Sequence, residues 1–250
     1  MSAKKSDARG GIMRFLIRAA FLFVLAVSVQ ALERDALAVL AEATLFSDAP
    51  AYSLLMTMSI SGGGTVKERS LSLKSLRGSD TEKTLAVVTA PAFLNKMAFL
   101  RIRDASGTRQ WLKTSNAVRR LAEGNKNERL FGSDFTAADF LDAATDARSA
   151  VFVSEDDASL VAVRAETDDG ARLVRFGKAD GLVRSVDYFD NDGTLLKRYR
   201  VTELAERGGR PYPKTAVMED LKSGGSTKLT VTGMEDSSPI PDRVFNPNAL

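Results

Sequence analysis

The sequence of 250 residues predicts a mainly β fold with helices (α+β), in which short strands form a curved or partly closed antiparallel meander. Three observations predict this class. Many short segments have an apolar residue at every second position, Asp-Gly or Gly-Gly pairs stand between the later ones, and only two stretches have helical spacing. No internal repeat or low-complexity linker is present, so we expect one domain over residues 32–250.

Residues 1–31 have the three parts of a secretion signal. Five basic residues between Lys4 and Arg18 precede an uncharged apolar run, Ala19–Val29, and Val29-Gln30-Ala31 presents the small residues that a signal peptidase reads. The alternative is an uncleaved anchor, but the apolar run is shorter than the roughly 20 residues that cross a bilayer. We therefore expect residues 1–31 to be removed and the rest of the chain to be released into the periplasm.

The positive charge of the sequence belongs to this signal. The whole chain has 35 basic and 32 acidic residues and a net charge of +3. Residues 1–31 contain five of these basic residues and one acid, which leaves 30 basic and 31 acidic residues, a net charge of −1, for residues 32–250. Nucleic-acid binding requires a basic patch on the folded domain, so this balance predicts no nucleic-acid partner.

The sequence contains no cysteine and no histidine. Without cysteine there is no disulfide framework and no acceptor for a lipid anchor, so the core alone must hold the fold. Without histidine a Ser-His-Asp triad and the usual zinc sites are impossible. Asp190–Gly193 lacks the spacing of a calcium loop and is expected to be a hairpin turn. We therefore predict a protein that is not an enzyme, with no catalytic residue, metal site or cofactor.

The elements follow one another in a simple order. Glu33–Phe46 is predicted to be an amphipathic helix because its apolar residues recur every three or four positions, and Tyr52–Ile60 a strand because they alternate. The polar segment Arg119–Asp134 is predicted to be a loop that leads into a second helix, whose start is marked by a capping box at Thr136 and Asp139. The other predicted strands are Arg69–Ser75, Thr84–Thr89, Met97–Ile102, Gln110–Lys113, Val151–Val153, Leu160–Ala165, Arg172–Phe176, Val183–Phe189, Leu195–Leu204, Thr215–Leu221 and Lys228–Met234.

The middle of the chain carries its most distinctive residues, which are Trp111-Leu112, Val118-Arg119-Arg120, Phe131-Gly132-Ser133-Asp134-Phe135-Thr136 and Asp139. This series resembles the outer-membrane lipoprotein-sorting proteins of the LolA-like group, which pair a tryptophan strand with a Val-Arg-Arg turn and a Gly-Ser-Asp-Phe helix start. The flanks fit too, with a signal, an amino-terminal helix, a hairpin at Tyr188–Gly193 and a terminal segment at Phe245–Leu250. One departure follows the tryptophan, where Lys113-Thr114-Ser115 replaces an aromatic residue and a proline.

The resemblance implies an incomplete antiparallel β-barrel, strongly curved and covered by helices on its concave face (LolA/LolB-like), which holds acyl chains in the gap. Methionine suits such a lining because its flexible thioether adapts to differently shaped ligands. The expected lipid-binding residues are apolar and lie on strands or on the helical lid: Tyr52, Leu54, Met56, Met58, Ile60, Phe99, Trp111, Phe135 and Phe140. The alternative for each of them is an ordinary core position.

Paired arginines in the central loop allow two interpretations. Arg119 and Arg120 are candidates for contact with a lipid headgroup or with a carboxylate on a partner, or they are simply solvated. Ser133 and Asp134 are expected to shape the helix start, because Ser133 has no histidine as a base.

Two functions compete at this point, and an enzyme comes third, because the acidic residues are spread over turns and no carboxylate pair stands out. The first is a periplasmic carrier, a monomer that holds acyl chains of a lipoprotein or lipid for transfer towards the outer membrane. Its expected partners are an inner-membrane transporter and an outer-membrane acceptor. The second is a non-catalytic accessory subunit of an envelope complex, with the same half-barrel filled by side chains.

Overall fold

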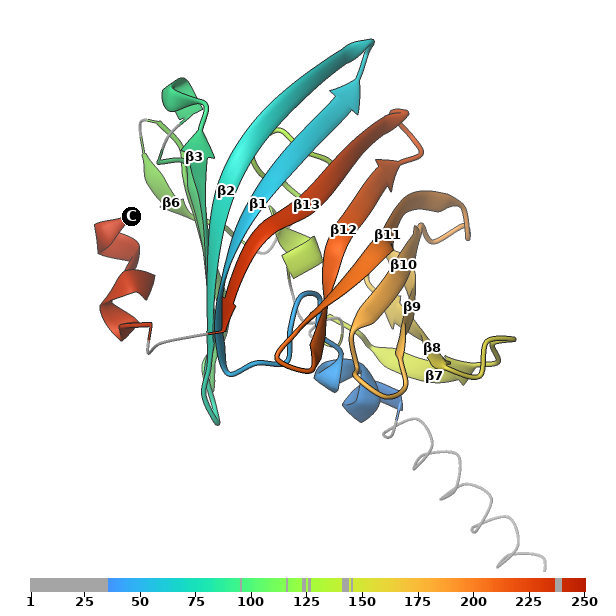
Figure 1. Ribbon diagram of the computed structural model, residues 1–250. Helices are drawn as coiled ribbons and strands as arrows, with labels where there is room; N and C mark the ends of the chain where they lie inside the picture. Colours follow the sequence, from blue (N-terminus) through green and yellow to red (C-terminus); the bar gives the residue numbers. More distant parts are fainter. Residues whose placement is uncertain are drawn as a thin grey trace, which may run out of the picture.

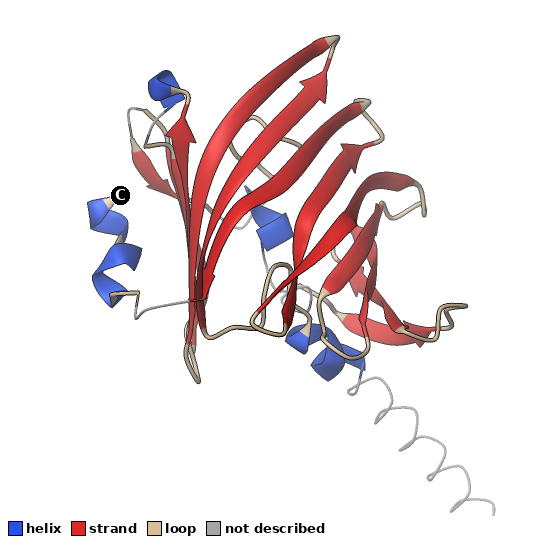
Figure 2. Cartoon of the chain, viewed as in Figure 1, coloured by secondary structure: helices blue, strands red, loops and turns tan. Residues whose placement is uncertain are grey.

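The computed structural model describes residues 36–94, 96–115, 117–122, 125, 127–140, 144, 146–236 and 240–250. The predicted signal, residues 1–31, lies outside the described residues. Strands dominate the described part and form one antiparallel sheet (Figures 1 and 2). They are β1 (Ala51–Gly62), β2 (Thr65–Arg77), β3 (Glu82–Ala90), β4 (Ala98–Asp104), β5 (Gly107–Lys113), β6 (Val118–Arg120), β7 (Ser149–Val153), β8 (Leu160–Thr167), β9 (Gly170–Gly177), β10 (Val183–Phe189), β11 (Leu195–Arg207), β12 (Arg210–Asp220) and β13 (Gly225–Asp236).

The sheet consists of two meanders joined side by side. Its order is β6-β5-β4-β3-β2-β1-β13-β12-β11-β10-β9-β8-β7, so the first and the last strand pair at its centre. The edges are β6 and β7, which do not pair with each other, and the sheet therefore stays open. It curves around the short 3-10 helix η3 (Ala137–Phe140), which lies in the connection between those two edges (Figure 1). The predicted curved, incomplete antiparallel barrel is thus confirmed as an open sheet.

Each of the twelve predicted strands corresponds to a strand of the sheet, and the predicted turn glycines have the backbone that tight turns need. Gly170 has φ +136° between β8 and β9, where an added Cβ would lie 2.0 Å from the carbonyl oxygen of Phe189. Only glycine fits such a position without displacing the neighbouring strand. One prediction was wrong in this part: Val118–Arg120 is not a turn but the edge strand β6, which pairs with β5.

The amino-terminal helix is shorter than predicted. Residues 36–42 are α-helical, and residues 33–35 lie outside the described residues. The prediction extended the helix to Phe46, but the backbone of Thr44 instead bonds to the sheet. Its N–H donates to the carbonyl of Gly181 (3.0 Å), and its own carbonyl accepts from Val183 N–H (2.8 Å). This pairing with β10 is a tertiary contact that ends the helix, and helical periodicity cannot reveal it.

The expected cover of helices over the concave face is not confirmed. In the described residues, this face meets the segment 36–47 and the segment 129–140, and α-helix is limited to residues 36–42. Ala137–Phe140 form only a 3-10 turn, and Leu141 lies outside the described residues. One of the two reciprocal hydrogen bonds of the predicted capping box is present: Thr136 N–H donates to Asp139 Oδ2 (2.6 Å).

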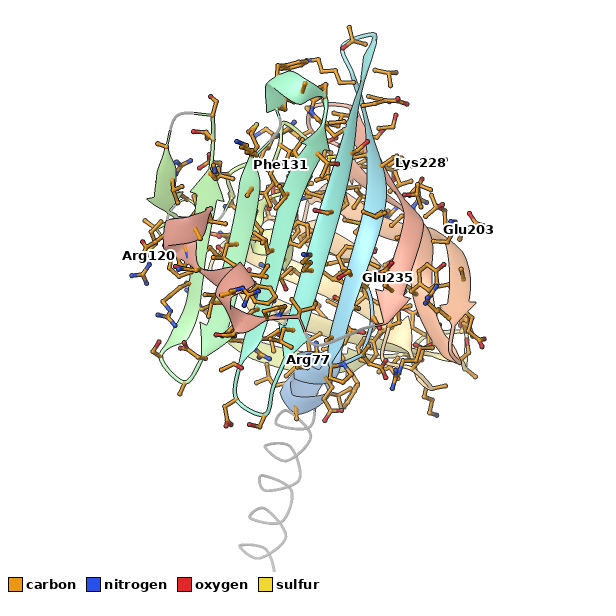
Figure 3. All side chains as sticks on the ribbon, turned by 60° about the vertical axis from the view of Figure 1, so that its left-hand side comes forward. Arg77, Arg120, Phe131, Glu203, Lys228 and Glu235 are labelled. Atoms are coloured by element: carbon orange, nitrogen blue, oxygen red, sulfur yellow. The ribbon has the colours of Figure 1, made fainter. Side chains whose placement is uncertain are left out.

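Apolar side chains pack on both faces of one half of the sheet. The main core fills the concave face and joins both meanders. A second, smaller core lies on the outer face of β3 to β5, where Leu85 and Leu100 pack with Phe245 and, partly buried, Trp111. Figure 3 shows the carboxy-terminal segment, with η4 (Asp242–Phe245) and η5 (Pro247–Ala249), lying across these strands.

Candidate binding cavity

A cavity of about 330 Å³ lies at one end of the concave face. The ends of β1 to β4 form one wall, and β9 and β10 form the other. Residues 41–47, which follow the amino-terminal helix, and Ala138–Phe140 line the space between the two walls. We call this region the cavity end of the concave face. A volume of this size falls within the range of small-molecule sites.

Three arginines surround one carboxylate in the β1 to β4 wall, and we call Arg77, Arg101 and Arg103 the arginine cluster. Arg101 Nη1 and Nη2 lie 3.3 and 3.4 Å from the two oxygens of Glu82. Arg103 Nη2 lies 3.1 Å and Arg77 Nη2 3.6 Å from the same carboxylate. Burial by itself would raise the pKa of Glu82, but the three guanidinium charges together outweigh burial and hold it below its ordinary value.

Strand register explains why these charges meet. Across β3 and β4, Glu82 is directly opposite Arg103, and Thr84 is opposite Arg101. Residues two apart on a strand share a face, so all four side chains belong to the concave face. Phe99 continues the same face of β4 into the core. One strand face therefore changes from aromatic to cationic within five residues.

Two ion pairs lie on or beside the wall formed by β9 and β10. Lys197 forms an ion pair with Asp139, and its Nζ lies 5.2 Å from the ring centroid of Tyr188. Arg172 donates two hydrogen bonds, of 2.9 and 2.6 Å, to the carboxylate of Asp146. Burial and, next, the negative charge of Asp139 raise the pKa of Tyr188 well above its ordinary value. The lysine and the arginine are therefore each paired with a carboxylate.

The Gly-Ser-Asp-Phe segment is tied to the sheet by Asp134. Its backbone N–H donates to Thr227 Oγ1 (2.9 Å), and the Thr227 hydroxyl donates back to Asp134 Oδ2 (2.7 Å). Arg129 Nη1 lies 3.1 Å from Asp134 Oδ1 and also pairs with Asp220 at the end of β12. Thr227 is fully buried on β13, so this network fixes the segment over the concave face.

The turn before η3 uses its serine for structure. Phe131 and Gly132 adopt positive φ angles of +56° and +72°. Ser133 Oγ donates to the carbonyl of Leu130 (2.7 Å) and accepts from Phe135 N–H (3.1 Å). The hydroxyl therefore holds the turn together, in agreement with its predicted role at the helix start.

The predicted lipid-binding residues separate into four groups. Tyr52 and Phe140 line the cavity, and Ile60 is half-buried against the main core. Trp111 belongs to the outer core beneath the carboxy-terminal segment, so the sheet separates it from the cavity. The remaining five are buried in the main core beyond the cavity, a region that we call the packed end: Leu54, Met56, Met58, Phe99 and Phe135.

Arg119 and Arg120 do not act together, because adjacent residues on a strand point to opposite faces. In the register of β5 and β6, Arg119 is opposite Leu112 on the concave face, and its guanidinium pairs with Glu128. Arg120 is opposite Trp111 and is exposed on the outer face (Figure 3). Neither arginine lines the cavity.

Sequence reasoning missed the arginine cluster and Glu82. A signal was present in β4, where Arg101 and Arg103 alternate with the apolar residues Leu100 and Ile102. Such alternation normally indicates a solvent-facing side, but here both faces of β4 are covered. Of the residues that the structure describes, no group of three histidine, cysteine, aspartate or glutamate side chains could hold a metal ion. Within the same residues no helix is long and apolar enough to cross a membrane.

Comparisons with known proteins agree on the fold. A family model described as an uncharacterized protein matches residues 80–250. A solved DUF1329-family protein from Desulfovibrio piger is 19% identical, with a TM-score of 0.73 over 81% of this chain and 92% of that chain. A Vibrio parahaemolyticus domain named for outer-membrane lipoprotein sorting is 20% identical, with a TM-score of 0.72 over 80% and 90%. A LolA-superfamily protein from Nitrosomonas europaea is 18% identical, with a TM-score of 0.65 over 87% and 99%. No curated protein matches the sequence.

Proposed function

This chain belongs to the family whose model matches residues 80–250, it is LolA-like, and from this premise we propose that it is a periplasmic carrier of acyl chains. The carrier takes an acyl chain of a lipoprotein or lipid into the cavity end of the concave face and releases it towards the outer membrane. It acts without catalysis, as a monomer, after removal of residues 1–31. An inner-membrane transporter is the proposed donor, and an outer-membrane protein the proposed acceptor.

The observation that carries this proposal is the cavity between the two sheet walls. Its apolar side is formed by Phe46, Phe140, Val174, Val183 and Val186. Each methylene that leaves water for such a surface contributes about 0.8 kcal/mol, so a buried stretch of ten contributes roughly 8 kcal/mol before ordering costs. This gain is enough to hold a chain in transit, and a partner or a movement of the segment 129–140 is then needed for release.

Binding of a fluorescent fatty-acid analogue to residues 32–250 tests the proposal. We expect saturable binding at micromolar concentration, and lipid in organic extracts of the purified protein by mass spectrometry. Val186→Phe fills the cavity and should abolish binding while the far-ultraviolet circular dichroism stays native. Val151→Phe is the matched control, because Val151 is 51% exposed on the edge strand β7. A native protein that neither contains lipid nor binds the probe would exclude the carrier function.

One observation favours the accessory-subunit alternative. Five of the nine predicted lining residues pack in the main core, so most of the half-barrel is filled by its own side chains. An accessory subunit would bind its envelope partner equally well with or without lipid. Cross-linking in envelope fractions before and after delipidation separates the two functions. The complexes that a carrier forms with its partners should depend on bound lipid, so Val186→Phe should reduce their amount.

A further inference from the structure

The cavity is small compared with the lipids of a membrane. Its volume is about 330 Å³. An apolar protein cavity of about 150 Å³ holds one benzene ring, which corresponds to about 25 Å³ for each carbon atom. At this rate the cavity has room for roughly 13 carbon atoms, and a second chain of equal length would double the required volume. The volume therefore sets an upper limit of one acyl chain of medium length.

The packed end of the concave face is occupied by its own side chains. Leu54, Phe99 and Phe135 are all buried there in the main core. Protein interiors are packed as densely as organic crystals, so these side chains leave little space that a longer acyl chain could enter. The far end of a chain that outgrows the cavity must therefore stay in water or displace packed side chains.

One aromatic ring stands between the cavity and the packed end. Phe140 lines the cavity, and its ring centroid lies 5.6 Å from that of Phe99 and 6.2 Å from that of Phe135. The ring of Phe135 in turn lies 6.2 Å from the ring of Tyr199. These three rings behind Phe140 belong to the main core and do not line the cavity. The Phe140 ring therefore forms the end wall of the cavity on the side of the packed end.

We propose that the cavity buries a single acyl chain of at most about 13 carbons, and that Phe140 sets this limit. This inference rests on the proposed carrier function and deepens it, because it names the size class of the ligand and the residue that selects it. Methylene groups within the limit leave water and add to the affinity, whereas those beyond it stay in solvent and add nothing. A cavity that continued into the packed end would show no such limit.

A series of straight-chain carboxylates from hexanoate to octadecanoate tests the limit, because only the chain length varies. Each probe is used below its micelle concentration, and displacement of the fluorescent fatty-acid analogue from residues 32–250 gives its affinity. We expect the affinity to rise about fourfold with each added methylene and to level off at about 13 carbons. An affinity that rises at the same rate up to octadecanoate would overturn the inference.

Two variants move the end wall. Phe140→Ala removes the whole ring, and Phe140→Leu replaces it with a smaller branched side chain, so the limit should lengthen by up to about six and about three carbons, respectively. Phe140→Leu keeps an apolar side chain in place and preserves the test if Phe140→Ala does not fold. Phe93→Ala is the matched control, since Phe93 is 77% exposed on η1 (Ala92–Leu94) and does not line the cavity.

The outcomes separate this inference from the carrier function. A limit that stays at about 13 carbons in every folded Phe140 variant would overturn the role of Phe140 as the end wall. Binding without a limit, or binding of the analogue that no carboxylate displaces, overturns the inference but leaves the carrier function standing. If neither the analogue nor any carboxylate binds, the carrier function fails as well.

Discussion

The packed end and the cavity end of the concave face are built from the same strands but have opposite chemistry. On β4, Phe99 is fully buried in the packed end, and two residues later Arg101 stands at the cavity with 5% exposure. On β1, Leu54 and Met56 are buried in the core, whereas Tyr52 lines the cavity. On both strands one end is packed into the core, and the other end borders the cavity in which we propose that a ligand binds.

The largest expected effect belongs to the packed end. Phe99→Ala should lower the free energy of unfolding by about 3–5 kcal/mol, because it removes a fully buried ring that lies 5.6 Å from the ring of Phe140 and leaves a cavity. Urea denaturation measures the loss. Phe93→Ala is the matched control, since Phe93 is 77% exposed and should change stability by no more than about 0.5 kcal/mol. If Arg101→Gln lowered the free energy of unfolding by as much as Phe99→Ala, the packed end and the cavity end would not differ in their contribution to stability.

The second-largest expected effect on stability concerns the segment 129–140, which crosses both ends of the concave face. Asp134→Ala should cost about 2–3 kcal/mol, because Thr227 loses its acceptor and Arg129 loses one of its two carboxylate partners. A double-mutant cycle with Thr227→Val measures the coupling between the two residues. We expect the double variant to be much less destabilised than the sum of the single ones, since both remove one shared interaction. Additive losses would show that Asp134 does not anchor the segment through Thr227.

The packed end was largely predictable from the sequence, because alternation places Leu54, Met56 and Met58 on one face and a sheet buries such a face. Whether a buried apolar residue contacts a ligand or another side chain depends on how distant elements meet, and no local pattern contains this information. Trp111 illustrates the limit, since its face of β5 is covered by Phe245 from the far end of the chain.

The charged residues of the cavity end were not predicted from the sequence, for a related reason. Glu82, Arg101 and Arg103 have the alternation of a solvent-exposed face, and only the pairing of β3 with β4 brings their charges together. The helix end at Thr44 was missed likewise, because the partner of its backbone is β10. Sequence patterns thus identified the elements, whereas the site arises from contacts between elements.

The third effect tests the charge balance of the cavity end. Glu82→Gln should lower stability at pH 7 by about 1–2 kcal/mol, because three arginines lose their shared carboxylate. The folded-state pKa of Glu82 lies below its ordinary value of 4.5, so its stabilisation is complete above that pH and is lost as the pH falls through the lower folded-state pKa. The difference between wild type and variant should therefore shrink below about pH 4.5. Urea titrations of wild type and variant at pH 7 and below about pH 4.5 check this prediction. A difference in the free energy of unfolding that does not change with pH would contradict it.

The smallest expected effect lies where the two ends meet, at Tyr52. Tyr52→Phe should cost about 1 kcal/mol at pH 7, since the phenol shares a hydrogen bond with the buried Ser75. Tyr199→Phe is the matched comparison: the Tyr199 hydroxyl is buried without a hydrogen-bond partner in the described part of the chain, so its removal should be neutral or stabilising.

The free energy of unfolding above pH 10 provides a second measurement for the prediction on Tyr52. Burial raises the pKa of Tyr52 from 10.0 to about 12, so above pH 10 the folded state retains a proton that the unfolded state releases. The wild-type free energy of unfolding should therefore decrease between about pH 10 and pH 12, and Tyr52→Phe should make the decrease shallower. An unchanged slope in the variant would mean that Tyr52 is as accessible to solvent as in the unfolded chain. The packed end of β1 would then begin at Leu54, the next residue of this strand on the concave face.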